Sequence, residues 1–236
     1  GGIMVYNIED AVVKKVVENS KSVIKIYPYK TPNYTIKNGI TFIDSSLGEI
    51  PLAFFGKHNL QNMAGAKWIC QHMGVGEDEF YEAIATFKGA SKRLEKIAEN
   101  SSTVVFKDFA HSPSKVEATT NAVKHQYKER KVIACLELHT YSSLNAEFLK
   151  EYVGALDSAD EAVVFYTPHA VEIKKLEKVS ADQIKQAFDR EDLVIYTNAE
   201  DFRNYLFTQD FENSAVILMS SGNYGGLDFE KIKEII

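Results

Sequence analysis

The second half of the chain alternates short apolar runs with longer segments in which apolar residues recur at helical spacing. The apolar runs, which are typical of strands buried on both faces of a sheet, are Thr103–Lys107, Lys131–Leu136, Glu161–Tyr166, Leu193–Tyr196 and Ala215–Met219. The helical segments cover residues 113–129, 145–156, 180–189, 199–207 and 228–236, the third of which opens on the capping-box pattern of Ser180 and Gln183. This alternation predicts an α/β fold, a mainly parallel sheet with helices on both faces.

The first part of the chain follows a different, mixed pattern. Four valines at helical spacing come after Glu9-Asp10 and predict a helix. Short strands are predicted at Val23–Tyr27, Tyr34–Lys37, Ile40–Ile43 and Ile50–Phe55, with Asn38-Gly39 as a tight hairpin turn, and helices at residues 58–73 and 77–86. Because the polar stretch Glu99–Ser102 separates the two patterns, we expect one domain over residues 1–98 and a second over residues 99–236.

Composition restricts the classes of partner. The net charge is −6, whereas a nucleic-acid-binding surface needs a basic excess, so we expect no nucleic acid partner. No apolar run approaches the roughly 20 residues that span a bilayer, and no leader pattern suggests export, so we expect a cytoplasmic protein with no membrane partner. Cys70 and Cys135 stand in apolar stretches without CxxC spacing, which indicates two buried free thiols.

Ligands of a parallel sheet bind beyond the carboxyl ends of its strands, which directs attention to the loops at residues 108–113, 137–145 and 219–227. In the first loop, Asp108 is a candidate acceptor for ribose hydroxyls and His111 a candidate donor to a phosphate. The alternative is that Asp108 only caps a helix and that His111 is a surface histidine. No GxGxxG stands at this turn, which excludes an NAD-linked oxidoreductase.

Two motifs of the first part carry candidate nucleotide contacts. In GKHNLQN, His58 and Asn62 lie one helical turn apart, and a carboxamide matches the donor and acceptor of an adenine edge. The alternative for this motif is a helix start capped by Asn59. In FKGASKRLE, Gly89 allows a sharp turn and Arg93 offers a planar fork to ribose or phosphate oxygens, unless the segment is only a solvated basic linker.

The other two loops are rich in hydroxyl groups and glycines. ELHTYS, at Glu137–Ser142, follows the second strand of the second domain, and SSGNYGG, at Ser220–Gly226, follows its last strand. The backbone amides of such a glycine-rich loop can hold a carboxylate, or the loop only connects a strand to a helix.

The order and spacing of GKHNLQN, FKGASKRLE, DFAHSP, ELHTYS and the last glycine-rich loop resemble the Mur ligase superfamily, whose members build the peptide of bacterial cell-wall precursors. Met219–Gly226 and Thr167–Ile184 are most similar to its murein peptide ligase branch, which joins L-Ala-γ-D-Glu-meso-diaminopimelate to UDP-N-acetylmuramate in peptidoglycan recycling. The UDP-N-acetylmuramate–L-alanine ligase branch is the alternative. The resemblance implies the remainder of a central ATPase domain at residues 1–98 and a C-terminal Rossmann-like domain at residues 99–236.

The resemblance also implies nucleotide-binding residues. Asn62 would contact adenine, with His58 and Asn59 shaping the pocket around it. Arg93 and Asp108 would hold the ribose. The implied cofactors are ATP and Mg²⁺, with the magnesium ligands expected upstream of residue 1, so that no metal ligand is assigned within this chain.

Four further residues are implied to lie near the reacting groups. His139 would face the phosphates, His111 would be catalytic, and Ser221 and Gly222 would bind the incoming murein tripeptide. In the implied chemistry, ATP phosphorylates the carboxylate of UDP-N-acetylmuramate to an acyl phosphate, which the peptide amine then attacks.

Some features depart from the superfamily pattern. The chain has no GxxxxGK[ST] loop, so we expect it to be inactive as a ligase by itself, and a non-catalytic nucleotide- or peptide-binding module is an alternative. Many members carry an arginine near the position of Ser143, for which Lys115 or Lys124 could substitute. Ser112 stands where members often have histidine or threonine. The sequence leaves the oligomeric state open.

Overall fold

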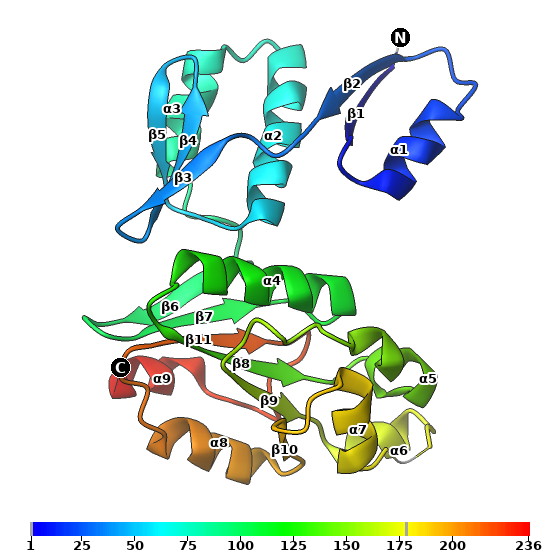
Figure 1. Cartoon of the computed structure of the whole chain (residues 1–236), viewed down its shortest axis with the longest axis vertical. Helices are drawn as coiled ribbons and strands as arrows, with labels where there is room; N and C mark the ends of the chain where they lie inside the picture. Colours follow the sequence, from blue (N-terminus) through cyan, green and yellow to red (C-terminus); the bar gives the residue numbers. More distant parts are fainter. Residues whose placement is uncertain (1, 178) are drawn as a thin grey trace. The chain divides into compact units, whose positions relative to one another are not determined.

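The computed structural model describes residues 2–177 and 179–236, and it divides into two compact units, Gly1–Lys88 and Gly89–Ile236 (Figure 1). The division falls earlier than the expected boundary after residue 98. The reason is that Glu95–Glu99 forms a strand, β6, which pairs antiparallel with β7 (Val104–Asp108) and so extends the sheet of the second unit. Glu95–Glu99 has no alternation of polar and apolar residues, so the periodicity of the sequence did not indicate this edge strand.

Unit 1 contains two small sheets. A parallel pair is formed by β1 (Ile3–Asn7) and β2 (Lys25–Tyr29), and an antiparallel sheet by β3 (Tyr34–Lys37), β4 (Ile40–Ser45) and β5 (Gly48–Leu52). The sequence did not predict β1. The predicted hairpin turn is confirmed, because Asn38 and Gly39 have φ of 53° and 73°.

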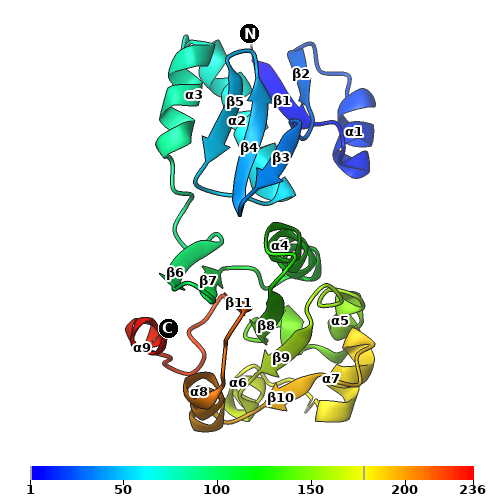
Figure 2. The ribbon, with the colours of Figure 1, turned by 60° about the vertical axis from the view of Figure 1, so that its left-hand side comes forward.

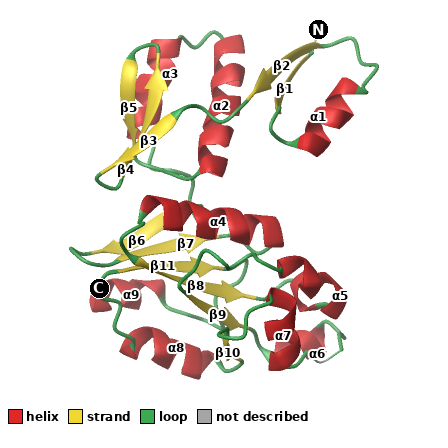
Figure 3. Ribbon diagram, viewed as in Figure 1, coloured by secondary structure: helices red, strands yellow, loops and turns green. Residues whose placement is uncertain are grey.

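Three helices complete unit 1, namely α1 (Ala11–Glu18), α2 (Lys57–His72) and α3 (Glu77–Thr86) (Figure 3). The side chain of Asp10 caps α1, as the sequence suggested. The suggested cap of α2 was wrong: α2 begins after Gly56, whose φ is 95°, and the amide of Asn59 instead donates to the carbonyl of Phe55 at 2.9 Å.

Unit 2 is built on a six-stranded sheet with the order β10-β9-β8-β11-β7-β6. The strands not yet given are β8 (Lys131–Glu137), β9 (Glu161–Phe165), β10 (Val194–Tyr196) and β11 (Ser214–Met219). All except β6 are parallel, which confirms the predicted mainly parallel α/β fold. The chain returns from β10 at one edge to place β11 between β7 and β8.

Helices cover both faces of this sheet (Figures 1 and 2). On one face α4 (Pro113–Gln126) contacts β8 and β11, and on the other lie α8 (Ala199–Thr208) and α9 (Phe229–Ile235). The remaining helices are α5 (Ala146–Leu149), α6 (Pro168–Ile173) and α7 (Ala181–Phe188). No helix in the described ranges is long and apolar enough to cross a membrane.

The helix predicted at residues 145–156 was wrong in most of its length. Only Ala146–Leu149 is α-helical, and 3₁₀ turns precede and follow it. The hydroxyl of Tyr152 donates to the backbone carbonyl of His111, and the φ of Gly154 is 77°, so the chain turns away after one helical turn. The helix α6 was not predicted, although Thr167 caps it and Pro168 begins it.

The two cysteines differ in accessibility, so the expectation of two buried thiols was wrong for one of them. Cys135 lies in β8 with no exposed surface, and burial raises the pKa of its thiol, whereas Cys70 on α2 is only half-buried. We expect a thiol reagent at neutral pH to modify Cys70 in the native chain, and Cys135 only after unfolding in urea. Rapid reaction of both thiols in the native chain would contradict the buried position of β8.

Candidate functional site

The loops that the sequence singled out follow three adjacent strands of unit 2. The order β8-β11-β7 places the loop after β11 between the other two. Met219 is in register with Asp108 on one side and with Leu136 on the other, so the three loops start side by side at the carboxyl edge of the sheet. This edge is the ligand crevice of open parallel sheets.

Asp108 is buried, with 4% of its surface exposed, and both carboxylate oxygens are engaged by the backbone. Its Oδ2 accepts from the N–H of Leu94 and its Oδ1 from the N–H of Ala110, both at 2.6 Å. The hydroxyl of Thr119 lies 3.4 Å from Oδ1. Asp108 therefore does not cap a helix; it fixes its own loop and the segment around Arg93.

The segment that carries Arg93 is a fixed turn. Lys92 and Leu94 have φ of 55° and 44°, and each left-handed residue of this kind costs roughly 1 kcal/mol or more. The N–H of Phe109 donates to the carbonyl of Lys92 at 2.9 Å, which joins this turn to the loop after β7. Arg93 is exposed, and its guanidinium carbon lies 5.4 Å from the centroid of the Phe109 ring.

His111 is oriented by its own loop. Its Nδ1 lies 2.7 Å from the carbonyl oxygen of Phe109, and its ring meets the Phe109 ring edge-on at 5.1 Å. A carbonyl only accepts hydrogen bonds, so Nδ1 carries the proton and Nε2 of the neutral ring is an acceptor. The neutral ring in this orientation would accept a proton or a hydrogen bond from a ligand, and would donate only as an imidazolium.

His139 and Gly222 bring the loops after β8 and β11 into contact. The His139 side chain is 48% exposed. A Cβ at Gly222 would lie 3.0 Å from Cγ of His139 and 2.8 Å from Oε2 of Glu137. The φ of Gly222 is not left-handed, so glycine is required here by the lack of space and not by backbone conformation.

Ser221 has an unsatisfied hydroxyl. Its Oγ is buried and has no hydrogen-bond partner among the described residues. A buried polar atom in this state costs about 1–3 kcal/mol, and such atoms in native structures call for a ligand or water. Ser221 precedes Gly222, so the unsatisfied hydroxyl belongs to the loop beside His139.

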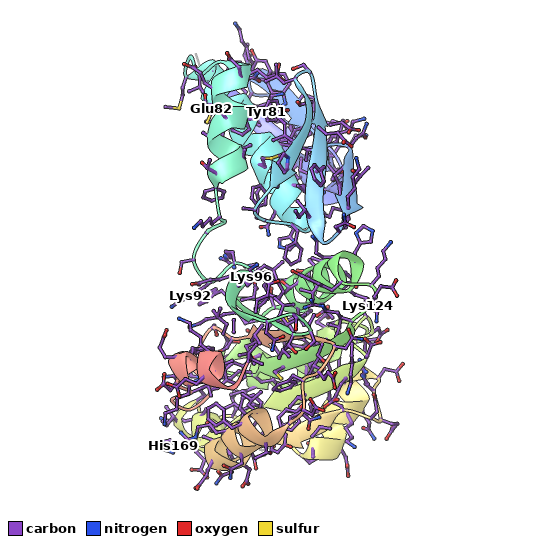
Figure 4. All side chains as sticks on the ribbon, turned by 90° about the vertical axis from the view of Figure 1, so that its left-hand side faces the viewer. Tyr81, Glu82, Lys92, Lys96, Lys124 and His169 are labelled. Atoms are coloured by element: carbon purple, nitrogen blue, oxygen red, sulfur yellow. The ribbon has the colours of Figure 1, made fainter. Side chains whose placement is uncertain are left out.

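The structure separates the two lysines considered as replacements for an arginine near Ser143. Ser143 is 1% exposed and closes a turn with Thr140. Lys124 (labelled in Figure 4) pairs with Asp160, which precedes β9 and so lies at the opposite edge of the sheet. Lys115, exposed in the first turn of α4, is the one at the carboxyl edge.

The predicted adenine residues belong to unit 1. His58 is half-buried and Asn62 is exposed one turn further along α2, while the amide of Asn59 is occupied by Phe55. Within the described ranges, no group of three or more His, Cys, Asp or Glu side chains is placed to hold a metal ion.

Sequence reasoning assigned no role to several residues that build this edge. They are Glu137 and Tyr224, which are linked by a hydrogen bond, and Leu94, whose N–H binds Asp108; Ser220 was expected only as a hydroxyl donor of its loop, and its hydroxyl donates to Glu137. Glu137 had a signal, because a charged residue directly continued a strongly apolar strand.

Comparison with known proteins agrees with this arrangement. The family model described as "Mur ligase, glutamate ligase domain" matches residues 92–222. The UDP-N-acetylmuramate–L-alanine ligase of Sulfurihydrogenibium sp. (strain YO3AOP1) is 28% identical over 231 residues, which are 94% of this chain and 50% of that protein. The chain thus spans about half the length of this relative.

Solved structures share the fold. A murein peptide ligase from Psychrobacter arcticus 273-4 aligns with a TM-score of 0.59 and 16% identity, over 100% of this chain and 52% of that one. The MurF ligase from Thermotoga maritima in complex with ADP aligns with a TM-score of 0.66 and 14% identity, over 100% of this chain and 53% of that one. With the family match covering more than half of its residues, the chain belongs to the Mur ligase family that is defined by the glutamate ligase domain.

Proposed function

We propose that this chain is one part of an ATP-dependent ligase. The whole ligase would take UDP-N-acetylmuramate as its acid and form an amide bond through an acyl phosphate. One observation carries the proposal: the three motif-bearing loops follow the adjacent strands β8, β11 and β7, so that His139, Gly222 and His111 stand at one edge. ATP would supply the phosphoryl group for the acyl phosphate. The chain's own residues would bind and orient the reactants at this edge.

Each unit contributes candidate nucleotide-binding residues. In unit 1, the exposed carboxamide of Asn62 would read the adenine edge, with His58 and Asn59 beside it. In unit 2, Arg93 would bind ribose or phosphate oxygens, held in place through Asp108. The ADP bound in the T. maritima MurF ligase supports a nucleotide site in this fold. Magnesium would accompany ATP.

The acceptor amine would be bound by the loop after β11. The unsatisfied hydroxyl of Ser221 supports this role, because a peptide carboxylate would supply the missing acceptor. His111, whose Nδ1 donates to Phe109, would receive a hydrogen bond from the amine at Nε2. His139, next to Gly222, would face the phosphates.

Two amine substrates are candidates. The residues of the loop Met219–Gly226 favour the murein tripeptide L-Ala-γ-D-Glu-meso-diaminopimelate, and the solved murein peptide ligase has the same fold. The name of the 28% identical relative favours L-alanine. Both would present a carboxylate to Ser221, so the size of the space beyond this loop would distinguish them.

Titration of the ¹⁵N-labelled chain with ADP tests the proposal. We expect saturable shifts at the amides of Arg93, Phe109 and His139, and a weaker affinity for GDP because Asn62 would match only adenine. L-alanine or the tripeptide, added with ADP, should then shift the amides of Ser221 and Gly222. No response of these amides to any of the three ligands would refute the proposed function, and a response to only one amine would identify the substrate.

A further inference from the structure

A single buried carboxylate joins the loop after β8 to the loop after β11. Glu137, the last residue of β8, is 3% exposed. Its Oε2 accepts from the hydroxyl of Ser220 and from the N–H of Tyr224, the latter at 2.9 Å. The Oγ of Ser220 accepts in turn from the N–H of Gly222 at 2.7 Å. Glu137 therefore holds three positions of the loop after β11, directly or through Ser220.

The same carboxylate also faces His139. Its Oε1 lies 3.6 Å from Nδ1 of His139, two residues further along the chain. The His139 ring packs against Gly222, where a Cβ would be 3.1 Å from Cδ2 of the ring. A displacement of Glu137 would therefore move both the backbone at Gly222 and the ring of His139.

The loop after β11 does not need the charge of Glu137 for its packing, because Tyr224 anchors it in other ways. Tyr224 has no exposed surface, its ring stacks on Phe202 at 5.0 Å, and its hydroxyl lies 2.8 Å from the carbonyls of Cys135 and Met219. Burial raises the pKa of Tyr224 well above its usual value, so the hydroxyl remains a donor. The far end of the loop is thus anchored without Glu137, and a buried carboxylate is stable only where hydrogen bonds compensate its lost hydration.

We propose that Glu137 is a positioning residue of the ligand site: it sets the orientation of His139 and holds the backbone of Ser220–Gly222 in the conformation that receives the ligand. It acts through these neighbours and is itself too buried to contact a ligand. The proposal rests on the proposed function for the identity of the ligand. The geometry on which it depends can be measured without any ligand.

Glu137→Gln is the informative variant, since the amide keeps the shape and one acceptor oxygen but loses the charge. Glu161→Gln is its matched control. Glu161 is a partly buried carboxylate on the neighbouring strand, at the opposite edge, where it accepts from the hydroxyl of Tyr205 at 2.7 Å and pairs with Lys131 at 2.6 Å. Both changes remove one charge and weaken a hydrogen bond from a tyrosine residue. Only Glu137→Gln lies next to the loops after β8 and β11.

Two readouts are compared in wild type and both variants: amide hydrogen exchange at Gly222 and Tyr224, and the dissociation constant for ADP. For Glu137→Gln we expect exchange at both amides to accelerate, and ADP binding to weaken, each about tenfold. Glu161→Gln should lower the melting temperature without changing either readout. If Glu137→Gln does not fold, Ser220→Ala tests the same link, and the exchange of Gly222 should accelerate alone.

The outcomes separate the two proposals. Unchanged exchange and unchanged affinity in Glu137→Gln would overturn the positioning role, as would equal changes in Glu161→Gln, which would indicate a general loss of stability. Failure of the wild-type chain to respond to ADP or to either amine would instead refute the proposed function. The exchange data would still decide whether Glu137 orders the loop.

Discussion

Replacing Asp108 by alanine should destabilise unit 2 by about 3 kcal/mol, because it removes two charge-assisted hydrogen bonds and leaves buried N–H groups without acceptors. The two N–H groups that would lose their acceptor are those of Leu94 and Ala110, both 2.6 Å from the carboxylate. The left-handed turn at residues 92–94 would relax, since this carboxylate helps to hold it. Arg93 would lose its orientation, and ADP binding should weaken by about tenfold or more.

Urea unfolding and ADP titration measure the two effects. The control is Asp160→Ala, which removes a carboxylate at the opposite edge of the same sheet. Asp160 is 41% exposed, pairs with Lys124 and accepts from the N–H of Val132 at 2.7 Å, so Asp160→Ala should also lower stability but leave the turn at residues 92–94 and the affinity for ADP unchanged. If Asp108→Ala lowered stability but left the affinity for ADP unchanged, Arg93 and its turn would not belong to the nucleotide site.

Gly222→Val should have the second large effect. It should weaken the binding of both the amine substrate and ADP, because Gly222 contacts the loop after β8 as well as its own. The first side-chain carbon would already lie 2.8 Å from Oε2 of Glu137 and 3.0 Å from the His139 ring, and the branched side chain needs still more room. Overpacking of this kind costs about 1–3 kcal/mol. The sequence analysis assigned Gly222 to the peptide alone; the contact with His139 extends the expected defect to ADP. We expect the shifts caused by the amine substrate to disappear and ADP binding to weaken about tenfold.

Gly226→Ala is the control for a change in stability alone. An added Cβ at Gly226 meets no atom within 4 Å, but its φ of 91° is unfavourable for any other residue. We expect this variant to lower the melting temperature and to keep both affinities. If Gly222→Val and Gly226→Ala lowered the affinities equally at matched stability, the loop would only connect β11 to α9.

Features that depend on neighbours in the chain were predicted well from the sequence. The five parallel strands of unit 2, the hairpin at Asn38-Gly39 and the capping box of Ser180 with Gln183 all follow from local periodicity or from turn and cap chemistry. The edge strand β6 was missed because three of its five residues are charged and no apolar run marks it, and the helix α6 because it has only six residues. The helix predicted at residues 145–156 failed because a long-range contact, from Tyr152 to the carbonyl of His111, ends it early.

The candidate site was only partly predictable. The motifs marked the right loops, because a parallel α/β sheet presents the carboxyl ends of its strands at one edge. The adjacency of the loops depends on β11 entering between β7 and β8, which periodicity does not encode. The orientation of the His111 ring and the unsatisfied hydroxyl of Ser221 likewise depend on geometry that composition does not reveal.

By itself, the sequence determined that the chain alternates strands and helices, that its sheet is mainly parallel and that three loops carry polar groups suited to a ligand. The tertiary structure decided what each buried carboxylate does. Asp108 binds a backbone amide 14 residues before it, and Glu137 binds a hydroxyl 83 residues after it. A buried charge must find its partners wherever the fold brings hydrogen-bond donors to it, and those donors are distant in the sequence.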